Sequence, residues 1–150
     1  MRISYRFAKN LSRPIIGLDH VFSGCRALID TGALFPVWTA SEESFIALGA
    51  LRDKALPTGY VGGLSGESEG SIYRYTLNMN GIYYINMPFI AIQMKRNKFH
   101  MILPATMFFG MDVDVDFAEH QLVIETNSNQ VSYNMHHRKD DDGTLTIYAQ

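Results

Sequence analysis

The chain has 150 residues, 47% of them apolar, which is enough for one domain with a buried core. Its 13 basic and 15 acidic residues are intermixed and give a net charge of -2, so no broad basic face is offered to nucleic acid. No apolar run approaches the roughly 20 residues of a membrane span. We expect a single domain over residues 1–150 that binds neither nucleic acid nor a membrane.

The first segments in chain order predict short strands. Residues 2–8 alternate apolar and polar side chains, and no signal-peptide stretch follows their basic residues, so we expect a cytoplasmic protein. Residues 14–18 and 25–30 are apolar runs on either side of a turn, which predicts a hairpin. Residues 36–38 resume as a strand, and Ser41 with Glu42 and Glu43 predicts a short helix that ends near Gly49.

Glycine is unusually dense between residues 59 and 70. The stretch contains Gly59, Gly62, Gly63, Gly66 and Gly70. Glycine at this density lets a hairpin tip bend and lets its backbone approach a ligand closely. A flexible surface loop is the alternative interpretation. No Gly-Lys-Ser/Thr sequence follows, so the stretch is not a phosphate-binding loop.

The second half of the chain again predicts short extended elements. Residues 71–78 and 82–92 form a hairpin about Asn80-Gly81, with the second strand broken at Pro88. Residues 99–103 predict a buried strand, and 104–110 a single helical turn that begins at Pro104. Further strands are expected at 111–116, 122–125 and 144–148. This pattern indicates an all-β fold with one or two short helices.

Cys25 is the only cysteine, which excludes an internal disulfide and a cysteine-based zinc site. A thiol nucleophile would need a paired histidine, and His20 lies five residues away across the predicted turn. The alternative is that Cys25 is a small buried side chain.

Two acidic clusters could suggest a metal. Asp112, Asp114 and Asp116 begin like a calcium loop, but Phe117 stands where glycine is needed and Val123 where glutamate is needed. His136-His137 with the aspartates at 140–142 would have to bring together side chains that point apart on a strand, so an exposed polar turn is favoured. We expect no metal and no organic cofactor.

The strongest chemical signal is Ala27-Leu28-Ile29-Asp30-Thr31-Gly32-Ala33. Leu28 and Ile29 favour a covered strand, and Gly32 ends it, so Asp30 should lie at the rim of the core. A carboxylate in that position either caps a turn or takes part in chemistry.

This stretch and two later ones resemble the retropepsin-like aspartic peptidases, the single-domain relatives of pepsin. The matching pieces are Arg26-Ala27-Leu28-Ile29-Asp30-Thr31-Gly32-Ala33, then Gly59-Tyr60-Val61-Gly62-Gly63-Leu64-Ser65-Gly66, then Phe99-His100-Met101-Ile102-Leu103. The resemblance implies a β-barrel with a core at about 14–125, a flap at about 59–73 and a C-terminal extension at about 126–150. Two positions differ from the family: Leu34 replaces a small or polar residue, and Pro104 replaces a glycine.

The resemblance implies an aspartic endopeptidase, whose chemistry requires two carboxyl groups. In pepsin and its relatives one carboxyl stays protonated while the other takes a proton from the attacking water. This chain has one Asp-Thr-Gly, so we expect a homodimer in which Asp30 of each copy is catalytic and the substrate is a polypeptide.

The resemblance also assigns roles to neighbouring residues. Thr31, Gly32 and Ala33 would complete the active-site loop, and the substrate-binding flap would contain Tyr60, Val61, Gly62, Gly63, Leu64, Ser65 and Gly66. One alternative is a catalytically inactive module with this fold that binds peptides or mediates dimerisation. Another is a self-processing or accessory domain of a larger system.

Overall fold

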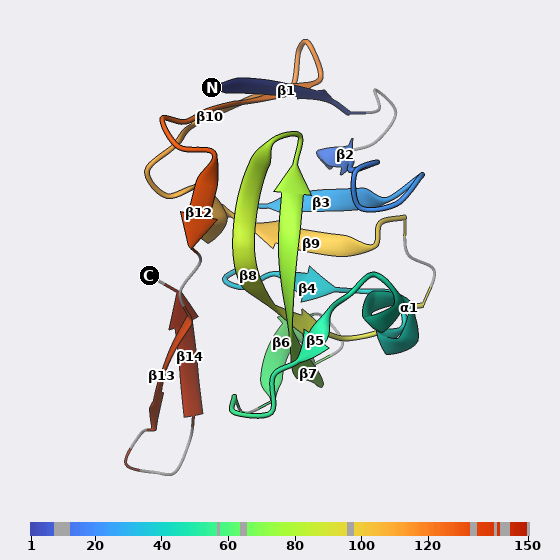
Figure 1. Cartoon of the computed structure of the whole chain (residues 1–150), viewed down its shortest axis with the longest axis vertical. Coiled ribbons are helices and arrows are strands. Elements are labelled where there is room, and N and C mark those ends of the chain that lie inside the picture. The colour runs from blue at the N-terminus through green and yellow to red at the C-terminus, as the bar shows by residue number, and fades with distance from the viewer. Residues whose placement is uncertain are drawn as a thin grey trace.

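Strands make up more than half of the residues that the structure describes (Figure 1). The computed structural model describes residues 1–7, 13–56, 58–63, 66–95, 98–132, 135–139, 141 and 145–149, with the main chain alone described for 59–63, 66–67, 135–139 and 145–149. The strands are β1 Arg2–Arg6, β2 Ile15–Gly17, β3 Arg26–Asp30, β4 Val37–Trp38, β5 Leu51–Arg52, β6 Gly59–Gly63, β7 Gly66–Met79, β8 Ile82–Ala91, β9 Met101–Pro104, β10 Asp112–Asp116, β11 Gln121–Glu125, β12 Gln130–Ser132, β13 Met135–Lys139 and β14 Leu145–Ala149.

Helical structure is limited, in the described ranges, to α1 Glu42–Ala47 and the 3-10 turn η1 Ala105–Phe108. The predicted all-β fold with one or two short helices is therefore confirmed. No helix within the described part of the chain is long and apolar enough to cross a membrane.

The strands form three sheets. The largest follows the order β2-β3-β9-β4-β8-β7-β5, with β12 beside β8 and β6 beside β7. A smaller antiparallel sheet has the order β1-β11-β10, and β13 pairs with β14 in a hairpin that projects from the rest (Figure 1). Within the largest sheet β3 and β9 run parallel, so both strands end at the same edge.

The core lies where the largest sheet folds over onto itself. In Figure 1 the β7–β8 hairpin runs across β3, β9 and β4, and one buried cluster joins Ile29 and Leu103 to Leu77 on β7. Trp38 stacks on Phe45 with ring centroids 4.3 Å apart and planes at 6°. Because Phe45 belongs to α1, this stack fixes the helix against the sheet.

The local signals for α1 and for the β7–β8 turn are confirmed. Ser41 caps the helix, since its hydroxyl oxygen accepts the Ser44 N–H at 3.2 Å. At the turn, Asn80 and Gly81 both adopt positive φ, 49° and 105°, which is the conformation that a tight hairpin requires.

The prediction that the strand breaks at Pro88 is wrong. β8 runs unbroken from Ile82 to Ala91, and Pro88 is paired with Arg74 of β7. Proline removes a single donor, so the ladder continues through its neighbours. The register changes instead near Thr76, whose hydroxyl accepts the Asn86 N–H at 3.1 Å.

Candidate functional site

β3 delivers Asp30 to the rim of the core. The strand is flanked by β2 on one side and β9 on the other, and its residues Ala27, Leu28 and Ile29 are buried. Asp30 is the last residue of the strand and is half-buried. The covered strand therefore ends in a carboxylate that solvent can reach, at the position that the sequence predicts.

The turn after Asp30 holds one of its two carboxylate oxygens. The Gly32 N–H donates to Asp30 Oδ1 at 3.0 Å, and the Ala33 N–H donates to the Asp30 main-chain oxygen at 3.1 Å. No described residue donates a hydrogen bond to Oδ2. Thr31 and Gly32 are exposed, and Ala33 is half-buried. The side chain is thus fixed by Oδ1, while Oδ2 remains available to a molecule from outside.

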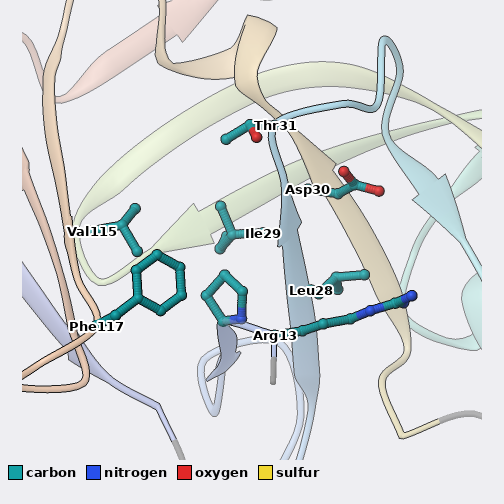
Figure 2. Close-up of a pocket in the computed structure, with 8 residues that line it drawn as sticks. Arg13, Leu28, Ile29, Asp30, Thr31, Val115 and Phe117 are labelled. Carbon is teal, nitrogen blue, oxygen red and sulfur yellow. The ribbon is translucent and has the colours of Figure 1, made fainter. Parts of the chain in front are cut away.

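An open hollow of about 450 Å³ surrounds the end of β3. We call it the Asp30 hollow, and it is lined by Arg13, Pro14, Leu28, Ile29, Asp30, Thr31, Val115 and Phe117. Figure 2 shows that side chains alternate across β3: Asp30 and Leu28 point to one side, whereas Ile29 and Thr31 point to the other, toward Val115 and Phe117. The hollow therefore has a carboxylate side and an apolar side.

Gly32 is not required by the chain's own conformation or packing. Its φ lies outside the left-handed region, and an added Cβ would meet only Asp30 Oδ1, at the ordinary contact distance of 3.4 Å. A glycine that its own chain does not need is explained when another backbone approaches closely.

The neighbouring strand β9 supports the Asp30 loop. Its register places Leu103 beside Ile29 and Pro104 beside Asp30. One residue into η1, the Thr106 hydroxyl donates to the Leu34 main-chain oxygen at 3.1 Å. The single helical turn that the sequence predicts after Pro104 is confirmed, and it is bonded to the loop that follows Asp30.

The glycine-rich stretch forms the predicted hairpin. β6 and the start of β7 pair antiparallel, with Tyr60 opposite Glu69, Val61 opposite Ser68, Gly62 opposite Glu67 and Gly63 opposite Gly66. Leu64 and Ser65 lie outside the described residues. The described residues that line the Asp30 hollow come from other parts of the chain, so the role of this hairpin as a flap stays a prediction.

The sequence did not indicate the far wall of the Asp30 hollow. Val115 and Phe117 reach it from β10 and the following turn, and Arg13 and Pro14 precede β2. None of them belongs to a recognisable motif, and the sequence marks Phe117 only as a residue that does not fit a calcium loop. Among the described residues, no group of three His, Cys, Asp or Glu side chains converges to hold a metal ion.

Cys25 is a small buried side chain. It has no exposed surface, and burial, followed by the nearby Asp19 carboxylate, raises the pKa of its thiol to about 12. His20 is exposed on the neighbouring turn. At physiological pH the thiol is protonated, so Cys25 is unsuited to act as a nucleophile.

Comparison with solved structures finds a similar fold. The chain resembles a retropepsin-like aspartic protease from Rickettsia conorii with a TM-score of 0.52 and 17% sequence identity, over 84% of this chain and 91% of that one. No protein-family model and no curated protein sequence matches the chain. Together with the strand-rich architecture, this similarity shows that the chain has a retropepsin-like fold.

Proposed function

We propose that the protein is an aspartic endopeptidase that works as a homodimer, with Asp30 of each copy as the catalytic carboxyl. The observation that carries this proposal is the Asp30 carboxylate at the end of β3, with Oδ1 held by the Gly32 N–H and Oδ2 open to the hollow. A carboxylate that is oriented by its own loop and accessible on one oxygen suits the activation of a water molecule.

The reaction requires two such groups. Two carboxyls about 3 Å apart do not both ionise at acid to neutral pH, so the pair shares one proton. The ionised member takes a proton from the attacking water, and the protonated member polarises the scissile carbonyl. Activity is expected from acid to neutral pH and is lost at alkaline pH, where both members have ionised.

The second carboxyl is best supplied by a second copy of the chain. The sequence contains a single Asp-Thr-Gly, and an isologous dimer places the same loop of each copy at the two-fold axis. The exposed Thr31 would join the two loops by hydrogen bonding. Gly32, which its own chain does not require, would leave room for the substrate backbone.

The substrate would be an extended polypeptide. Such a chain can pair with main-chain groups of the β6–β7 hairpin while side-chain pockets select residues near the cleaved bond. Leu28 on the carboxylate side of the hollow favours a bulky apolar side chain at the cleavage site.

The test compares the wild type with Asp30→Asn on a denatured protein mixture at several pH values. New peptide ends are mapped by mass spectrometry, and sedimentation gives the oligomeric state. We expect dimeric wild type to cut and the Asn variant to remain folded and dimeric but inactive, with wild-type cleavage blocked by a statine-type inhibitor. Equal cutting by both proteins would refute the role of Asp30.

A second candidate is an inactive module of the same fold that binds peptides or dimerises. The observation that favours it is Pro104, which stands beside Asp30 in the ladder and offers no N–H there. This candidate predicts that folded, dimeric wild type binds peptides but does not cut them at any pH.

A further inference from the structure

The apolar side of the Asp30 hollow is open to solvent next to Thr31. Phe117 is 61% exposed, although its ring edge contacts Phe7 at a centroid distance of 5.9 Å. Val115 is half-buried, and Figure 2 shows both side chains facing Ile29 and Thr31 across the hollow. An apolar wall therefore flanks the loop that carries the carboxylate, on the face of β3 opposite the carboxylate itself.

The same loop presents an apolar side chain outward. Leu34 is 68% exposed, four residues after Asp30, and the Thr106 hydroxyl fixes its main-chain oxygen at 3.1 Å. An exposed leucine alone carries little information. Here the exposed leucine belongs to the same short loop that the open apolar wall flanks, within a single site that is incomplete in one copy.

Resting on the homodimer of the proposed function, we propose that Leu34 of each copy packs into the apolar side of the partner's Asp30 hollow, against Phe117 and Val115. This contact would hold the two Asp30 loops together, so Leu34 determines whether the catalytic pair forms.

Symmetry selects a second copy as the occupant. A shared proton requires the two Asp30 side chains to meet at the two-fold axis, so the 30–34 segment of each copy must lie against the Thr31 region of the other. Leu34 is the largest exposed apolar side chain of that segment. Because an isologous interface repeats every contact, the dimer would contain two such contacts.

The first test measures dimerisation by sedimentation and peptide cleavage by mass spectrometry. Leu34→Ser removes the apolar side chain without adding charge beside Asp30, and Leu34→Met restores an apolar one. Leu51→Ser is the matched control, because Leu51 is 71% exposed on β5, outside the Asp30 hollow.

We expect Leu34→Ser to raise the dissociation constant of the dimer by at least roughly 30-fold, the size of a hot-spot truncation, and to lower peptide cleavage in proportion. Leu34→Met and Leu51→Ser should behave like the wild type.

The outcomes separate this inference from the proposed function. If the wild type is a dimer that cuts peptides and Leu34→Ser is an equally tight dimer, the contact is refuted and the peptidase stands. If the wild type is a dimer that does not cut, but Leu34→Ser dissociates it, the contact is supported and the peptidase fails. A wild type that is monomeric at every concentration refutes both.

A second test asks by cross-linking whether Leu34 of one copy lies next to Phe117 of the other. Leu34→Cys protein carrying one tag is mixed with Phe117→Cys protein carrying another and oxidised, so that a disulfide between the two tagged chains joins different subunits. Native Cys25 is fully buried and does not compete. We expect the doubly tagged dimer to exceed that from Leu51→Cys mixed with Phe117→Cys. Equal yields from the two mixtures would overturn the proposed contact.

Discussion

Asp30 and Pro104 are paired residues in the parallel ladder of β3 and β9. Proline has no N–H to donate, so this last rung gives the Asp30 loop less main-chain support than another residue would. Support comes instead from the Ile29–Leu103 pair one rung earlier and from the hydrogen bond between Thr106 Oγ1 and the Leu34 oxygen. The loop is therefore held from both sides of Pro104.

Replacement of Pro104 by glycine distinguishes the active from the inactive interpretation. Glycine restores an N–H but adds freedom to the unfolded chain, so we expect a loss of about 1 kcal/mol in the free energy of unfolding. If the loop is already adequately supported, kcat/KM should change by less than roughly tenfold. Urea unfolding and peptide cleavage measure the two effects. Activity that appears only in Pro104→Gly would instead show that proline silences the site.

Gly32→Ala should separate stability from activity. The new Cβ meets only Asp30 Oδ1, at 3.4 Å, so the free energy of unfolding should change by no more than about 0.5 kcal/mol. The proposed function predicts that peptide cleavage falls by at least about tenfold, because the methyl group would occupy space that the substrate backbone or the second copy would need. Urea unfolding curves and initial rates of peptide cleavage test this prediction. An unchanged cleavage rate would show that neither the substrate backbone nor the second copy comes close to Gly32.

Gly70→Ala should destabilise the protein strongly. An added Cβ would clash with the Ala91 main-chain oxygen and would lie 2.7 Å from Ile92 Cγ1, next to the Ser71–Ala91 pair of the β7–β8 ladder. We expect a loss of about 2–3 kcal/mol, in the upper part of the roughly 1–3 kcal/mol that overpacking costs, because a main-chain atom would have to move. Gly17→Ala on β2 is the control, since nothing lies within 4 Å of its Cβ and its effect should stay within about 0.5 kcal/mol. Similar melting temperatures for both variants would contradict the clash at Gly70.

The Asp53–Arg74 ion pair predicts a loss of stability in acid. Arg74 Nε donates to Asp53 Oδ2 at 2.9 Å, and this hydrogen bond lowers the pKa of Asp53 below its usual value. The stabilisation is fully present above the unfolded pKa of about 3.9 and is lost as the pH falls through the lower folded value. Asp53→Asn should therefore cost about 1–2 kcal/mol at pH 7.

Urea unfolding at pH 7 and in strong acid checks the ion pair. The difference between the wild type and Asp53→Asn should shrink as the pH falls below about 4. Glu125→Gln is the control, because its pair with Arg2 is exposed on both sides and should contribute less than about 1 kcal/mol. If the wild type and Asp53→Asn differ in free energy of unfolding by the same amount at every pH, the charge of Asp53 is not the cause of the difference.

The features that depend on neighbouring residues could be predicted from the sequence. Leu28 and Ile29 followed by Gly32 placed Asp30 at a strand end, and Ser41 marked the start of α1. These features are local, because strand burial, turn conformation and helix capping depend on residues a few positions apart.

The surroundings of the site could not be predicted in this way. Phe117 and Val115 reach the Asp30 hollow only because β10 and its sheet come to lie beside the end of β3, which no local pattern specifies. At Pro88 a local pattern gives the wrong prediction. Proline favours a break in the strand, but β8 stays paired with β7 on both sides of it.

The burial of Cys25 has a practical consequence for tests of the proposed activity. A thiol with no exposed surface and a pKa of about 12 is protonated and shielded, so alkylating reagents and mild oxidants should leave the native protein unmodified. Reducing agents are therefore unnecessary during purification, and a contaminating cysteine peptidase can be silenced by alkylation without affecting the protein under study. Proteolysis that persists after alkylation and is lost in the Asp30→Asn variant can be assigned to this chain.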